Sequence, residues 1–187
     1  ASTNYCKLAI DIGAASGIAL DDEGRILVAS PRNSRVWRFT GEIPTGPDAA
    51  GGCGRTDATG APLVDAGRIV KESFIQHGTI ATPSGIARGP NGNWFVSSVL
   101  TSRIAEFSPA GVLVRSIMAP PEGPVAELPA STGHPQSLAF DAQGRLYYAD
   151  LNLIGSSLAP DTGPNGTLRR IDFDAAGAPQ PPVVVRR

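Results

Sequence analysis

One pattern, present three times without gaps, constrains this chain more than any other feature. It occupies residues 16–30, 84–98 and 136–150. Each copy has a run of small and apolar residues, a polar turn that ends in glycine, and a second apolar run. Two apolar runs around such a turn are typical of a β-hairpin, in which glycine supplies the positive φ of the turn. The sequence therefore predicts three equivalent hairpins.

Two further sets of strands follow the hairpins. Apolar and polar residues alternate at 35–39, 103–107 and 168–173, as in a half-buried third strand. An Ala-Gly pair then precedes an apolar segment in each unit, which predicts a fourth strand. Four strands in each of three units indicate an all-β fold, a β-propeller of four-stranded antiparallel blades with about three blades present. Small residues in the first strand suit the crowded centre of such a ring.

The spacing of the hairpins sets the expected blade boundaries. The interval between the first two hairpins is longer than the next, so the first unit carries an insertion. We place it at residues 41–64, where Gly, Pro, Ala and Asp dominate, as in a loop. The blades are expected at about residues 15–76, 84–118 and 136–187.

Composition agrees with this fold class and argues against two classes of partner. The chain has 22 Gly, 17 Pro and only 18% charged residues, which favours turns over amphipathic helices. It has 17 acidic and 16 basic residues without a basic cluster, so we expect no nucleic-acid partner. No apolar run approaches the roughly 18 residues of a membrane helix, so we expect no membrane span.

The first unit resembles an NHL-type repeat. From residue 16 it reads Ser-Gly-Ile-Ala-Leu-Asp-Asp-Glu-Gly-Arg-Ile-Leu-Val-Ala-Ser, and from residue 33 it reads Asn-Ser-Arg-Val-Trp-Arg-Phe. The third unit is similar, and the resemblance covers most of residues 15–187. It extends to the six-bladed superfamily of gluconolactonase-like proteins, strictosidine synthase-like proteins and streptogramin lyases. The resemblance therefore implies a six-bladed ring.

The chain departs from this repeat and from a closed ring. Ser30 and Ser98 stand where the repeat often has aspartate, and residues 151–166 separate the second and third strands of the last unit. Three blades leave two open sheet faces, which need a neighbour. We expect the remaining blades to come from a longer chain or from a second copy of this one.

Four residues are candidate ligands for one divalent cation, calcium or zinc. His77 and His134 precede inner strands, near the mouth of the axial channel, and the resemblance implies a comparison with amidating lyases, whose histidines near this position bind zinc. Asp150 and Asn152 lie at a strand end and resemble the axial oxygen ligands of the gluconolactonase group. Two alternatives stay open: the histidines are ordinary loop residues, and Asp150 caps the turn that follows its strand.

The two cysteines bear on the compartment. Cys6 and Cys53 form no CxxC pair and are too few for a metal cluster. They predict a disulfide in an exported protein, extracellular or periplasmic, with two unrelated thiols as the alternative.

The sequence contains no nucleophile elbow, no phosphate-binding glycine loop and no paired zinc motif. We therefore predict an exported binding or scaffolding module, in which residues 41–64 and 151–166 on one rim hold a protein or carbohydrate partner. The alternative is a metal-dependent hydrolase or lyase of the gluconolactonase-like superfamily. There, a cation on the propeller axis polarises a carbonyl or activates water.

Overall fold

The computed structural model describes residues 8–9, 12–42, 56–61, 69–119, 133–151 and 166–186. These stretches form three four-stranded antiparallel sheets with three short 3-10 helices. No helix within them is long and apolar enough to cross a membrane. The prediction of an all-β chain with about three four-stranded units is therefore confirmed.

The three sheets, called blades 1 to 3, each contain four strands paired in chain order. Blade 1 contains β1 (Ile18–Leu20), β2 (Ile26–Ser30), β3 (Arg35–Gly41) and β4 (Ile69–Ile75). Blade 2 contains β5 (Pro83–Arg88), β6 (Trp94–Ser98), β7 (Arg103–Phe107) and β8 (Leu113–Met118). Blade 3 contains β9 (Pro135–Phe140), β10 (Leu146–Asp150), β11 (Thr167–Ile171) and β12 (Val183–Arg186). The helices are η1 (Pro31–Asn33), η2 (Gly78–Ile80) and η3 (Val99–Thr101).

The repeated hairpins form as predicted. Gly24, Gly92 and Gly144 have φ values of 74°, 79° and 76° in the turns between first and second strands. In two of these turns an aspartate accepts two backbone hydrogen bonds: Asp21 from residues 23 and 25, and Asp141 from residues 143 and 145. Turn chemistry thus accounts for both carboxylates.

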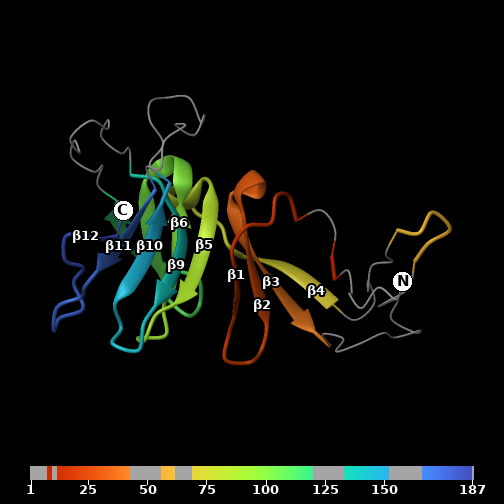
Figure 1. The fold of residues 1–187 in the computed structure, drawn as a ribbon. Helices are drawn as coiled ribbons and strands as arrows, with labels where there is room; N and C mark the ends of the chain where they lie inside the picture. Colours follow the sequence, from red (N-terminus) through yellow and green to blue (C-terminus); the bar gives the residue numbers. More distant parts are fainter. Residues whose placement is uncertain are drawn as a thin grey trace.

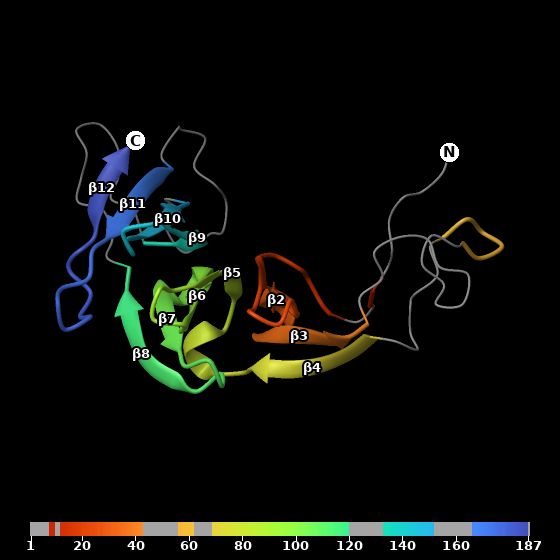
Figure 2. The ribbon, with the colours of Figure 1, turned by 90° about the horizontal axis from the view of Figure 1, so that it is seen from below.

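The first strand of blade 2, β5, contacts the first strands β1 and β9 on its two sides, and the blades fan out in an arc (Figures 1 and 2). The N–H of Gly17, just before β1, donates to the carbonyl of Ser84 at 2.6 Å. A Cβ atom on Gly17 would collide with this carbonyl, and one on Gly85 would collide with the carbonyl of Gln136. The small residues are therefore required by the close approach of neighbouring blades.

Buried apolar side chains form one cluster between blades 1 and 2 and another between blades 2 and 3. Because side chains alternate along a strand, Trp94 and Val96 of β6 pack towards blade 1, whereas Phe95 packs towards blade 3. Leu27 of β2 and Tyr148 of β10 complete the two contacts from the neighbouring blades. Each large apolar side chain buried in this way contributes about 1.5–3 kcal/mol.

The two ends of the blades are built differently. The hairpin end carries the turns between first and second strands, and the loop end carries η1, η2 and η3 with the chain entering each first strand (Figure 1). The chain leaves β3 at Gly41, at the hairpin end, but leaves β10 at Asp150, at the loop end. Residues 41–64 and 151–166, which the sequence predicts on one rim, thus leave their strands at opposite ends, but most of both segments lies outside the described residues. In an antiparallel sheet, connections after the third and the second strand leave at opposite ends.

Candidate functional site

The predicted cation ligands that the structure describes belong to the loop end. The structure describes His77, His134 and Asp150, whereas Asn152 lies outside the described residues. Cys6 and Cys53 also lie outside them, so the disulfide stays a prediction.

Asp150 is held by the protein from two sides. Its side chain is buried, and Oδ1 accepts a hydrogen bond from the backbone N–H of His134 at 3.0 Å. Oδ2 lies 3.3 Å from Nη2 of Arg169, which is itself only 3% exposed. Nε of Arg169 in turn donates to Oγ1 of Thr167 at 3.1 Å. This network ties together the start of β9, the end of β10 and the start of β11. The turn that follows β10 lies outside the described residues, so the turn-capping alternative for Asp150 stays a prediction.

Blade 2 uses the same position for the same purpose. Ser98 occupies the place of Asp150, and its Oγ accepts from the backbone N–H of Thr82, the counterpart of His134, at 3.1 Å. Blade 3 differs because Arg169 stands where blade 2 has Ala105. Sequence reasoning missed Arg169. The sequence feature that could have revealed it is a charged residue at a position where the alternation of the strand predicts a buried side chain.

The two histidines occupy non-equivalent positions. His134 directly precedes β9, whereas His77 caps η2, with Nδ1 accepting from the backbone N–H of Thr79 at 3.2 Å. The His77 ring also packs edge-to-face on Phe107, with ring centroids 6.2 Å apart. The structure therefore does not place the two imidazoles as equivalent ligands from successive blades.

The donors that the structure describes do not fit a calcium or zinc site. Within those stretches of chain, no three His, Cys, Asp or Glu side chains form a group that could hold a metal ion. Asp150 uses its oxygens for His134 and Arg169, and His77 uses Nδ1 for Thr79.

An open hollow of about 520 Å³ lies beside η2 at the loop end. It is lined by Ser34, Gln76, His77, Gly78 and Ala81. Oγ of Ser34, at the end of η1, donates to the carbonyl of Ala81 at 2.6 Å, and Oγ1 of Thr101 donates to the carbonyl of Thr79 at 3.0 Å. These bonds hold η2 against the turns of blades 1 and 2. The hollow therefore presents polar groups from a fixed backbone.

No family model matches the chain, and no curated protein matches it. Solved structures do match. A luciferin-regenerating enzyme is 18% identical with a TM-score of 0.52, covering 83% of this chain and 44% of that one. A putative gluconolactonase is 14% identical with a TM-score of 0.55, covering 100% and 53%. A gluconolactonase from Xanthomonas campestris is 13% identical with a TM-score of 0.53, covering 96% and 48%.

These matches, together with three sheets that fan out from their first strands, decide the fold. The chain has the β-propeller fold. This propeller segment spans about half the length of each of the three matched chains. The predicted resemblance to gluconolactonase-like propellers is thus confirmed for the fold, while the NHL assignment stays a prediction.

Proposed function

We propose that this chain is part of an exported β-propeller that binds a partner at its loop end. The hollow lined by Ser34, Gln76 and His77 carries this proposal, because binding sites are concave and place a few polar groups on a rigid frame. Hydroxyl, amide and imidazole groups can both donate and accept hydrogen bonds. They match the hydroxyl groups of a carbohydrate, which we favour over a protein partner.

The experiment measures binding of the purified natural protein to a panel of immobilised glycans, followed by calorimetry with any glycan that binds. Gln76→Ala is expected to weaken binding about tenfold, which corresponds to about 1.4 kcal/mol. Gln143→Ala, at the hairpin end, is the control and should bind like the unmodified protein. Loss of binding in both variants, or no binding to any glycan, would overturn the proposal.

Metal analysis of the same protein separates this function from a metal-dependent hydrolase or lyase like the gluconolactonases. The binding proposal expects no bound metal. If the protein binds one calcium or zinc ion per ring, and His134→Ala loses it, the binding proposal is wrong and the metal-dependent enzyme is favoured. His134→Ala leaves the backbone N–H that Asp150 uses, so the fold is expected to survive the change.

We also propose that further blades complete the ring, and that a longer chain supplies them. At both blade junctions a glycine faces the carbonyl of the next first strand, but blade 3 has Ser137 at this position. Any next blade joined through the same geometry would meet the Ser137 side chain, so we expect that junction to differ from the other two. A longer chain is favoured because the matched propeller chains are about twice as long as this one. Intact mass and light scattering of the natural protein test this: a ring made of two 187-residue copies would contradict it.

A further inference from the structure

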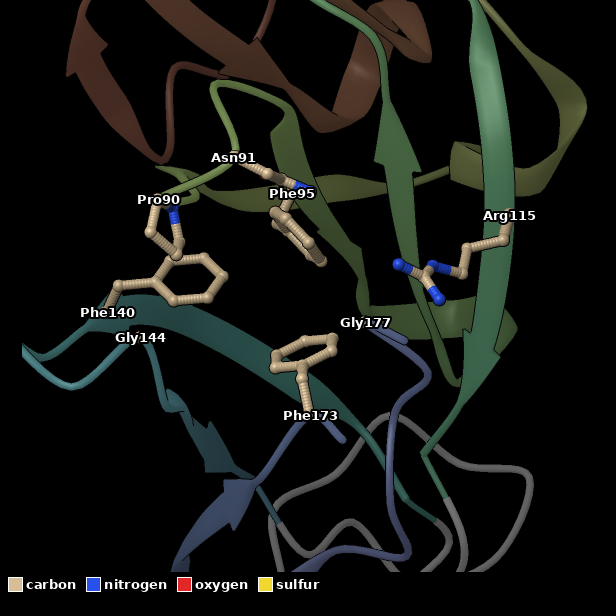
Figure 3. A pocket seen from close by; sticks show the side chains of 8 residues that line it. All are labelled: Pro90, Asn91, Phe95, Arg115, Phe140, Gly144, Phe173 and Gly177. Carbon is tan, nitrogen blue, oxygen red and sulfur yellow. The ribbon is translucent and has the colours of Figure 1, made fainter. Parts of the chain in front are cut away.

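An apolar pocket of about 130 Å³ opens at the hairpin end, between blades 2 and 3 (Figure 3). Three phenylalanines form its walls: Phe95 from β6, Phe140 from the end of β9, and Phe173, which follows β11. Gly144 and Gly177 line the pocket without side chains that could fill it. The pocket lies at the opposite end of the blades from the proposed partner site.

The three rings form a slot. Phe95 meets Phe140 and Phe173 edge-to-face, with centroids 4.9 and 5.9 Å apart. Phe140 and Phe173 are nearly parallel, at 26°, with centroids 6.3 Å apart. Atoms in direct contact lie about 3.5–4 Å apart, so two layers of contact across a flat ring need about 7–8 Å. A small outward movement of either phenyl ring therefore admits a flat ring between them.

Arg115 of β8 supplies the polar group of the pocket. Its Nε donates to the carboxylate of Glu106, which is fully buried and also accepts from the side chains of Asn91 and Asn93. The guanidinium is directed towards the space between the rings, 6.0 Å from the centre of the Phe173 ring (Figure 3). Because Nε is used by Glu106, the two Nη groups are the donors that face the pocket.

The equivalent place between blades 1 and 2 is a smaller pocket of about 70 Å³, lined mostly by charged side chains. Arg88 occupies the position of Phe140, lies 4.8 Å over the Trp94 ring, and pairs with Asp22 at 2.9 Å. The position of Asp22 is taken by Pro90 in the next blade. The same fold therefore narrows this volume with charged side chains between blades 1 and 2, but leaves it larger and apolar between blades 2 and 3.

We propose that this pocket binds a small molecule that carries one aromatic ring and a carboxylate. The ring lies between Phe140 and Phe173, and the carboxylate accepts two hydrogen bonds from the Nη groups of Arg115. The volume suits a single ring, and paired hydrogen bonds from a guanidinium match the two oxygens of a carboxylate. The proposal is independent of the proposed loop-end function.

Ligand-observed saturation-transfer NMR on the purified protein tests the pocket with 3-phenylpropionate and, as its uncharged match, 3-phenylpropan-1-ol. We expect the acid to bind at least fivefold more tightly than the alcohol. Arg115→Lys keeps a positive charge for Glu106 but loses the paired donors, so it should remove this preference. Phe140→Leu should weaken both probes.

Arg38→Lys is the matched control, because Arg38 forms the corresponding cross-strand ion pair of blade 1, away from the pocket. It should leave binding of both probes unchanged, as should Gln76→Ala at the loop end. Absence of saturation transfer to the acid, equal affinity for acid and alcohol, or an unchanged preference in Arg115→Lys would each overturn the proposal.

Discussion

The junction between blades 1 and 2 and the junction between blades 2 and 3 share one backbone arrangement but differ in their side chains. In both, a glycine faces the carbonyl of the neighbouring first strand. At the first junction Gly17 bonds directly to the carbonyl of Ser84. At the second, Ser97 bridges, accepting from the N–H of Gly85 at 2.7 Å and donating to the carbonyl of Gln136 at 2.5 Å.

The cross-strand charge pairs differ more strongly. Blade 1 pairs Arg38 with Glu72, whose side chain is 40% exposed. Blade 2 reverses the charges at the same positions, so that Glu106 is fully buried and Arg115 covers it. The two junctions therefore share their backbone contacts near the axis, whereas the side chains at their hairpin ends differ in charge and burial.

The largest difference between the junctions is expected from removing one acid at a time. Glu106→Ala should lower the free energy of unfolding by about 3–5 kcal/mol, because Glu106 is buried and its loss leaves Arg115 and the side chains of Asn91 and Asn93 without their acceptor. Glu72→Ala breaks an exposed pair and should cost less than about 1 kcal/mol. Urea denaturation monitored by tryptophan fluorescence measures both. Equal losses would remove the distinction between the two pairs.

The shared backbone contact predicts similar losses at both junctions. Gly17→Ala and Gly85→Ala should each lower the free energy of unfolding by about 2–3 kcal/mol, since the added methyl group meets a backbone carbonyl that cannot turn away. Gly78→Ala is the control, because nothing lies near its Cβ position. If Gly85→Ala were as stable as Gly78→Ala by thermal melting, close approach of the first strands would not be the reason for glycine.

Acid should weaken blade 2 through Glu106. Burial alone would raise the pKa of this carboxyl, but hydrogen bonds from Arg115, Asn93 and Asn91 outweigh burial and hold the pKa below its ordinary value of 4.5. The stabilisation is therefore complete above pH 4.5 and is lost as the pH falls towards the lower pKa of the folded protein. Unfolding free energies measured from pH 6 downwards to about pH 3 should fall less steeply in Glu106→Gln. An unchanged slope would contradict this assignment.

The smallest change in the free energy of unfolding is expected when the ion pair of the first junction is introduced at the equivalent positions of the second. Phe140→Arg should lose about 1 kcal/mol through its contact with Phe95. Adding Pro90→Asp should recover about 0.5 kcal/mol by recreating the pair of Arg88 with Asp22. A double-mutant cycle isolates this coupling. Zero coupling would mean that the two hairpin ends are not interchangeable.

The predicted cation ligands show that contacts between side chains of different strands could not be predicted from the sequence. The pattern placed His77, His134 and Asp150 correctly near strand ends, but it could not show that Asp150 lies against Arg169, nineteen positions further along the chain. The two histidines lie at different offsets from their inner strands, and in the structure Thr82, not His77, is the counterpart of His134. Sequence spacing reports position along a strand, not which side chains meet across a sheet.

The hairpins and the strand order follow from local pattern, because turn geometry and alternation act over a few residues and recur in each unit. The pocket of Phe95, Phe140 and Phe173 and the network around Glu106 were decided only by tertiary structure. Their members come from different strands and, in the pocket, from two blades. They acquire a function only when blade packing brings them together, because burial and charge pairing depend on neighbours that are distant in the sequence.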